Sequence, residues 1–369
     1  MSVSILDRVD RQLSNSLPVV AYRKPNEKKV RVVLQSNAEL HYVENYLESG
    51  FVFAPFNSKN RAVLIECHEV FEGDFDGGTT NLAPFVPVNG EKDLHRENYL
   101  AAIKKGIASI ASRKLEKVVL SRVLEVETPK KPLTLFEELL NLYPTAFCYI
   151  WFHPKIGLWL GATPEIFLEM ENHRFRTMSL AGTQLYQEGE DPKWGIKELE
   201  EQEMVTNFIK ESLLGKVASL KVSEAKSTKA GNLWHIKSTV TGDMGKFGLA
   251  EIINALHPTP AVCGVPKEGA KEFILDHEGY DREFYTGFLG ELNFKEEVRR
   301  PTTRRNQENR AYRTIKKKTS LYVNLRCMQL ADELAKIYVG GGITGRSVPE
   351  DEWEETKAKS RTMLNILCK

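Results

Sequence analysis

The feature that most limits the possible folds is the irregular order of strand-like and helix-like segments along the 369 residues. Short runs rich in β-branched residues, such as Val30–Leu34 and Lys117–Leu124, have the composition of strands. Longer segments with apolar residues at helical spacing, such as 197–214 and 350–367, occur among them without strict alternation of strand and helix. No internal repeat is visible, which argues against solenoids and propellers. The order therefore predicts an α+β fold with large antiparallel or mixed sheets.

Three segments near the C-terminus give local predictions. The apolar run Leu321–Leu330 predicts one strand. The glycine triplet Gly340–Gly342 predicts a turn, because glycine tolerates the backbone conformations that tight turns need. Ten basic and three acidic residues occur between Lys295 and Lys318, in a stretch with few large apolar side chains. This composition predicts a solvated loop.

The charge balance and the cysteines limit the partners and the compartment. The formal net charge is only +1, which argues against a globally polyanionic partner such as nucleic acid. The five cysteines are scattered without a Cys-x-x-Cys pair, so we expect neither a disulfide framework nor a zinc site. Charges interrupt the N-terminal apolar residues too often for a signal peptide, and no stretch has the length of a membrane helix. We expect a cytoplasmic monomer that binds no membrane.

Two pairs of glutamates have the spacing of ligands on a helix. Glu198 and Glu201 lie three residues apart, as do Glu352 and Glu355. Each pair can project from one helical face. Two such pairs facing one another would offer the oxygen ligands that Mg²⁺ prefers. The same spacing also fits ordinary solvated helix faces, which are more common.

Two further residues could transfer protons. Lys117 shares one face of its predicted strand with Val119 and Ser121, and if that face is internal, desolvation lowers the pKa of the ammonium toward the range of a general base. Glu165 ends the small-residue turn 161–165 and could be held as a neutral acid. The alternatives are a lysine at the surface end of a strand and an exposed turn glutamate.

Glycine, histidine and arginine positions could bind an anionic ligand. The backbone at Gly182 and Gly340 can approach such a ligand closely, because glycine carries no side chain. His235 and Arg326 lie in apolar, strand-like surroundings. Tight turns, a core histidine and a structural ion pair would explain the same residues without any ligand.

Nine short blocks, taken in their order along the chain, resemble the chorismate-utilising enzymes, the family that includes anthranilate synthase component I. The resemblance covers roughly residues 90 to 367. The blocks are Lys-Val-Val-Leu-Ser-Arg at 117–122, Gly-Ala-Thr-Pro-Glu at 161–165, Leu-Ala-Gly-Thr at 180–183, Leu-Trp-His at 233–235, His-Pro-Thr-Pro-Ala at 257–261, Asp-Arg-Glu-Phe-Tyr-Thr-Gly at 281–287, Leu-Arg-Cys at 325–327, Gly-Gly-Gly-Ile at 340–343 and Glu-Trp-Glu-Glu-Thr at 352–356.

This resemblance implies the architecture and the ligands. The family fold is α+β, with two large, mostly antiparallel sheets packed between helical layers and an active site between them that holds Mg²⁺ and chorismate. Residues 91–369 would form the chorismate-binding catalytic core, with the basic loop 295–318 as an insertion. Residues 1–90 would be a weakly matching N-terminal part of the same domain.

The resemblance also implies a role for each candidate residue. Lys117 would deprotonate a water that attacks C2 of the chorismate ring, and Glu165 would protonate the departing C4 hydroxyl. The metal ligands would be Glu201 and Glu355, with Glu198 and Glu352 holding its waters. The substrate-binding residues would be Gly182 and Lys359 at the ring carboxylate, Arg326 and Gly340 at the enolpyruvyl carboxylate, and His235 and Thr259 near the ring hydroxyl.

Members of the family add different nucleophiles to the ring. Lys117 matches the base of isochorismate synthases, which add water. Ala181 stands where aminodeoxychorismate synthases place a nucleophilic lysine, and the block at 257–266 most resembles isochorismate synthases. The resemblance therefore favours a magnesium-dependent isochorismate synthase, an isomerase of menaquinone or siderophore biosynthesis. A salicylate synthase, which goes on to eliminate pyruvate, and the ammonia-using anthranilate and aminodeoxychorismate synthases remain alternatives.

Overall fold

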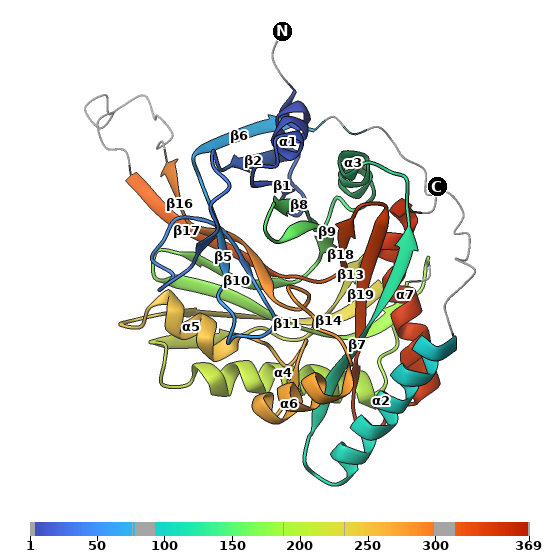
Figure 1. Ribbon diagram of the computed structural model, residues 1–369. Helices are drawn as coiled ribbons and strands as arrows, with labels where there is room; N and C mark the ends of the chain where they lie inside the picture. Colours follow the sequence, from blue (N-terminus) through green and yellow to red (C-terminus); the bar gives the residue numbers. More distant parts are fainter. Residues whose placement is uncertain are drawn as a thin grey trace.

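Two antiparallel sheets form the centre of the protein in the computed structural model (Figure 1). The structure describes residues 4–75, 77, 93–186, 188–231, 233–298 and 314–367. Sheet A contains, in spatial order, β15 (Gly264–Val265), β7 (Lys117–Glu127), β19 (Leu334–Ile343), β18 (Cys327–Ala331), β9 (Gly157–Thr163), β8 (Phe147–His153), β1 (Val19–Arg23), β2 (Lys29–Leu34) and β6 (Glu69–Asp74).

Sheet B lies against sheet A and has ten strands, nine of them in its main path. It contains, in spatial order, β12 (Ser219–Val222), β14 (Leu233–Asp243), β11 (Arg174–Leu185), β10 (Ile166–Glu171), β17 (Thr314–Val323), β16 (Phe288–Val298), β4 (Gly50–Ala54), β5 (Val63–Glu66) and β3 (His41–Tyr42), while β13 (Lys226–Ala230) also pairs with β14. The strands before residue 75 are therefore divided between the two sheets and pair with strands from the rest of the chain.

Helices cover the outer face of each sheet (Figure 1). Apolar residues of α1 (Ile5–Ser14), α3 (Pro132–Leu142) and α7 (Pro349–Leu367) pack on sheet A. Those of α4 (Ile196–Leu213) and α5 (Leu249–Leu256) pack on sheet B. The remaining helices, α2 (Asp93–Ala111) and α6 (Lys267–His277), pack beside β7. The predicted α+β class, with two large antiparallel sheets between helical layers, is confirmed.

Apolar side chains also fill the space between the sheets. Along β8, Cys148 and Ile150 face the helices, whereas Tyr149 and Trp151 face sheet B. Because successive side chains of a strand point to opposite faces, a strand covered on both faces needs apolar residues throughout. This requirement explains the unbroken apolar run at 147–152.

The structure corrects the three local predictions near the C-terminus. Residues 321–330 do not form one strand, because β17 ends at Val323 in sheet B and β18 begins at Cys327 in sheet A. The glycine triplet lies inside β19 and not in a turn. The two ends of the basic segment are strand residues of β16 and β17, which pair as a hairpin. The remainder of that segment, 299–313, lies outside the described residues.

Within the parts of the chain that the structure describes, no helix is both long enough and apolar enough to cross a membrane.

Candidate active site

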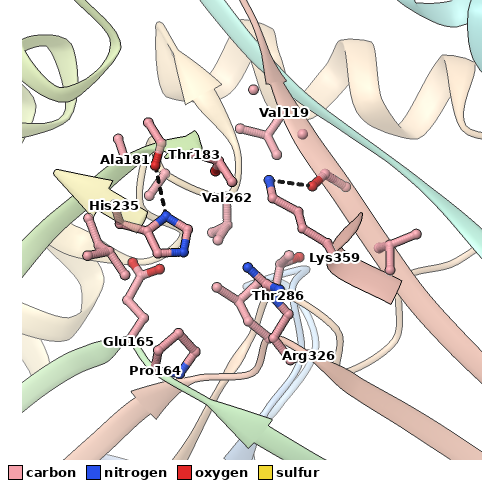
Figure 2. A pocket seen from close by; sticks show the side chains of 18 of the residues that line it. Val119, Pro164, Glu165, Ala181, Thr183, His235, Val262, Thr286, Arg326 and Lys359 are labelled. Atoms are coloured by element: carbon pink, nitrogen blue, oxygen red, sulfur yellow. Dashed lines mark hydrogen bonds between the residues drawn. The ribbon is translucent and has the colours of Figure 1, made fainter. Parts of the chain in front are cut away.

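A cavity with about 680 Å³ of empty space lies between the sheets, where strands from both of them meet (Figure 2). Its walls come from β7, β11, β14, β19 and the helices α4 and α7. The predicted site residues that line it are Glu165, Gly182, Glu201, His235, Arg326, Gly340 and Lys359. Residues more than 190 positions apart in the sequence therefore converge on one space.

Two neighbouring crossovers between the sheets carry Glu165 and Arg326. The chain passes from β9 in sheet A to β10 in sheet B at Glu165, and it returns from β17 to β18 at Arg326. Hydrogen bonds join the crossovers: the N–H of Val323 donates to the carbonyl of Glu165 (3.0 Å), and the N–H of Ala162 donates to the carbonyl of Arg326 (3.0 Å). The two segments thus form one hydrogen-bonded seam, which fixes the acid and the cation relative to each other.

Lys117 lies beneath the cavity at the start of β7. Its side chain is fully buried, so the face that it shares with Val119 is internal. Its Nζ lies 2.8 Å from Oε1 of Glu201, a residue of α4 that lines the cavity. The pair brings a primary amine and a carboxylate together at one wall.

The glycine triplet of β19 leaves room for these charged groups. A Cβ at Gly342 would collide with Oε1 of Glu201 and would lie 3.0 Å from Cε of Lys117. A Cβ at Gly340 would lie 2.6 Å from the carbonyl oxygen of Leu120, which is closer than a real Cβ can come. The prediction of a turn was wrong because close approach of neighbouring groups, and not backbone curvature, requires glycine here.

Glu165 is a buried carboxyl group at the edge of the cavity, with only 4% of its surface exposed. Burial raises its pKa to about 8, although the positive charges of Lys117, Lys359 and Arg326 act in the opposite direction. At neutral pH the group is therefore mostly protonated, and it can donate a proton to a ligand.

His235 stands beside Glu165 in the cavity (Figure 2). Its Nδ1 lies 2.8 Å from the carbonyl oxygen of Gly182, which can only accept, so Nδ1 carries the hydrogen. Burial lowers the pKa of His235 to about 3, and the charge of Arg326 adds to this effect. The ring is therefore neutral. Its buried Nε2 has no hydrogen-bond partner among the described residues and is left as an acceptor.

Arg326 and Lys359 form a cationic wall opposite His235 (Figure 2). The Nη1 of Arg326 reaches only the hydroxyl of Thr362, at 3.5 Å, and no carboxylate within the described ranges pairs with the guanidinium. The Nζ of Lys359 donates to the carbonyl of Gly340 (3.0 Å) and pairs with Glu355 at 2.5 Å. Arg326 is half-buried, and a guanidinium without a carboxylate partner in such a place is suited to an anionic ligand.

Three of the four predicted metal-binding glutamates are each paired with a lysine. The pairs are Glu201 with Lys117, Glu352 with Lys197, and Glu355 with Lys359. Glu352 is 1% exposed, and its Oε2 has no hydrogen-bond partner in the described parts of the chain. Burial and the adjacent Glu355 raise the pKa of Glu352. Burial opposes ionisation of Glu355 as well, but Lys359 holds its pKa below the usual range.

The fourth glutamate, Glu198, is used differently. Its Oε2 accepts a hydrogen bond from the backbone N–H of Gly195 at 2.9 Å, which caps the first turn of its own helix. Among the described residues, no three His, Cys, Asp or Glu side chains already form a group that could hold a metal ion. Carboxylate oxygens suit a hard cation, and the free buried oxygen of Glu352 fits one. Glu198 fits less well.

Family profiles place this cavity in a known context. A profile described as chorismate binding enzyme matches residues 73–298, and a second with the same description matches residues 312–365. The first match alone covers more than half of the chain. The chain belongs to the chorismate-binding enzyme family. The resemblance found in the sequence is therefore confirmed.

Individual relatives of this chorismate-binding enzyme are isochorismate synthases. It is 29% identical to isochorismate synthase DhbC of Bacillus subtilis, over 73% of this chain and 68% of that enzyme. It is also 29% identical to isochorismate synthase EntC of Escherichia coli, over 72% of this chain and 65% of that enzyme. The matches thus span about two thirds of the relatives' lengths. The menaquinone-specific isochorismate synthase MenF from Escherichia coli shares the fold, with a TM-score of 0.75, 18% identity, and coverage of 100% of this chain and 92% of that chain.

One predicted substrate-binding residue of this chorismate-binding enzyme, Thr259, does not line the cavity. The hydroxyl of Thr259 is buried and has no hydrogen-bond partner among the described residues, but its neighbours Ala261 and Val262 line the cavity in its place. Residues 259–263 form a turn in which the N–H groups of Val262 and Cys263 both donate to the carbonyl of Thr259.

Sequence reasoning missed the residues that hold the cavity walls together. Arg282 is buried and donates to the carbonyls of Val119 (2.7 Å) and Val262 (2.9 Å), two residues that line the cavity. Its partner Glu278 accepts from the backbone N–H of Ser121 at 2.7 Å. The motif at 281–287 contains Arg282, but a sequence cannot show which backbone carbonyls a buried guanidinium reaches.

Proposed function

We propose that this enzyme is an isochorismate synthase, which converts chorismate to isochorismate reversibly without an ammonia source. The observation that carries the proposal is the presence of two buried proton-transfer groups at one cavity. Lys117, paired with a cavity-wall carboxylate, is the candidate base, and Glu165, with a pKa of about 8, is the candidate acid. The similarity to isochorismate synthases supports the same assignment.

The substrate carboxylates would bind at the cationic wall. Chorismate carries a ring carboxylate and an enolpyruvyl carboxylate, and the cavity offers Arg326 and Lys359. A guanidinium can bind a carboxylate through two parallel hydrogen bonds. The neutral His235, with its free Nε2, would accept a hydrogen bond from a ring hydroxyl.

The reaction then needs one proton removed and one supplied. Lys117 Nζ would take a proton from water, and the water oxygen would form a bond to C2 of the ring. The ring double bonds would shift, the C4–O bond would break, and the leaving hydroxyl would take the proton of Glu165 to depart as water. In the reverse direction the ionised Glu165 acts as the base and the protonated Lys117 as the acid.

Magnesium is proposed as the metal ion. Enzymes of this type are in general metal-dependent. Glu201 and Glu355, together with the unpartnered oxygen of Glu352, would hold the ion, with Glu198 nearer its bound water. When bound, Mg²⁺ would neutralise and orient the ring carboxylate.

Ala181 in the cavity wall supports water as the nucleophile, rather than a lysine that attacks the ring covalently. Ala181 is buried and lines the cavity between Leu180 and Gly182. A methyl group at this position supplies no nucleophile. The bond to C2 would therefore be formed by a small molecule that enters the cavity, and the base at Lys117 favours water.

We also propose that residues 1–90 and 91–369 belong to one domain, because each sheet contains strands of both segments, joined by the pairing of β1 with β8 in sheet A and of β4 with β16 in sheet B. The enzyme would act as a cytoplasmic monomer without a nucleic-acid partner. The basic loop 295–318, whose two ends belong to the hairpin of β16 and β17, would be an insertion.

The decisive experiment is incubation of the protein with chorismate and Mg²⁺ in ammonia-free buffer, with chromatographic identification of the products. We expect isochorismate, which is lost when EDTA is added and in Lys117→Gln and Glu165→Gln. Lys114→Gln, which changes an exposed lysine near the same strand, should retain the activity. Accumulation of salicylate and pyruvate would identify a salicylate synthase, and turnover only with added ammonia would contradict the role of Lys117.

A further inference from the structure

A groove with an excess of positive charge adjoins the catalytic cavity. This basic groove, with about 1200 Å³ of space, shares Pro164 and Leu180 with the catalytic cavity, so the two spaces adjoin at the wall next to Glu165. Five basic residues line it, against the two acidic residues Glu27 and Glu169. The basic residues are Lys24, Arg176, Lys229, Lys237 and Lys318.

Three of these lysines have no acidic partner among the described residues, and one of them, Lys229, is exposed and lies over the ring of Tyr186. Lys24 pairs with Glu291 at 2.6 Å, and Arg176 pairs with Glu169. By contrast, Lys237 and Lys318 are half-buried, and neither lies within ion-pair distance of a carboxylate in the described ranges. Lys237 lies directly opposite Leu180 in the pairing of β14 with β11, so it adjoins the shared wall. Glu171 lies opposite Lys318 in the pairing of β10 with β17 and offsets part of its charge, whereas Lys237 has no carboxylate within ion-pair distance in the described ranges, so a net positive potential remains inside the groove.

The groove on the opposite side of the cavity has the reverse charge. It shares Thr183 with the catalytic cavity, and six acidic residues line it against three basic ones. It includes Glu198 and Glu355 of the proposed metal set. A dicarboxylate would be repelled on this side and attracted on the other.

We propose that the basic groove is the route by which the dicarboxylate substrate reaches and leaves the catalytic cavity, with Lys237 and Lys318 as its anion-attracting residues. The inference rests on the proposed function, because only an anionic substrate gains from this potential. By the same reasoning, cations would enter through the acidic groove on the other side. Substrate and metal ion would thus approach the cavity from different sides.

The test is the dependence of kcat/KM for chorismate on ionic strength in Lys237→Gln/Lys318→Gln. At about 20 mM salt we expect kcat/KM to be about fivefold lower than in the wild type, with kcat changed less than about twofold. At about 300 mM salt the difference should nearly vanish, because screening shortens the reach of the lost charges. A structural defect would not disappear with salt.

Two control variants complete the test. Lys104→Gln/Lys105→Gln removes the same number of charges from exposed positions on α2 and should behave as wild type. Lys237→Arg/Lys318→Arg keeps the charge and should keep kcat/KM. A double glutamine variant that equals wild type at low salt, or whose loss is independent of salt, overturns the route while the proposed function stands. Wild-type protein that does not turn over chorismate overturns both.

Discussion

Glu165 makes the stability of the enzyme depend on pH in a direction opposite to that of an ordinary carboxylate. Its pKa rises from 4.5 to about 8 on folding, so the folded state binds the proton more tightly than the unfolded state does. Well below pH 4.5 Glu165 is protonated in both the folded and the unfolded state and does not lower the free energy of unfolding. The free energy of unfolding then falls as the pH rises from 4.5 through about 8. The loss is about 1.4 kcal/mol per pH unit, or about 3 kcal/mol at pH 7.

Glu165→Gln removes this penalty, because the amide is neutral at every pH. We expect the variant to lack isochorismate synthase activity and yet to exceed the wild type in free energy of unfolding. The difference should grow from near zero below about pH 4 to about 3 kcal/mol at about pH 7. Urea unfolding at several pH values measures it, with Glu203→Gln, at an exposed position on α4, as the control. A difference between Glu165→Gln and wild type that does not change with pH would refute the raised pKa.

Four further predictions follow from the same site. The rate of isochorismate formation should fall above about pH 8 as Glu165 loses its proton, and the rate of the reverse reaction should rise over the same range; pH profiles of kcat in both directions check this. Arg326→Ala should raise KM for chorismate by about tenfold or more, since a hydrogen bond to a charged group contributes about 1.5–3 kcal/mol. Steady-state kinetics measures this, and an unchanged KM would disprove the prediction. Gly342→Ala should lower kcat at least about tenfold, because the added methyl group would displace Glu201 and Lys117. Gly345→Ala is the control and should keep kcat, since the nearest atom to its added Cβ would be 3.6 Å away. Equal kcat values for the two variants would be inconsistent with the close approach at β19. Removal of Mg²⁺ with EDTA should abolish activity and readdition should restore it, and unchanged turnover in EDTA would exclude the metal role of Glu201 and Glu355.

The sequence predicted the fold class and most of the cavity wall, because both depend on local signals. Strand-like runs and helical periodicity sufficed for α+β, and the ordered motifs led to Glu165, His235 and Arg326, which the structure brings to one cavity. The apolar run at 321–330 was misread because both of its halves are buried strands. Periodicity cannot reveal that the chain changes sheets between them.

Other features depend on contacts between distant segments, which one sequence does not contain. The pairing of Lys197 with Glu352 joins residues 155 positions apart. The capping role of Glu198 competes with the metal role that its spacing predicts. The clamp formed by Arg282 on the carbonyls of Val119 and Val262 likewise becomes visible only when three segments are folded together.

The hydrogen-bonded seam at Glu165 and Arg326 determines how the enzyme can move. Two stacked sheets can slide over one another most easily where nothing crosses between them, and here two chain segments cross side by side. The sheets are held together at this point, and they are joined again at the far edge, where residues 67–68 connect β5 of sheet B to β6 of sheet A. Because these hydrogen bonds join the two crossovers, Glu165 and Arg326 would move together. Hydrogen exchange should accordingly be slowest at the amides of Ala162 and Val323.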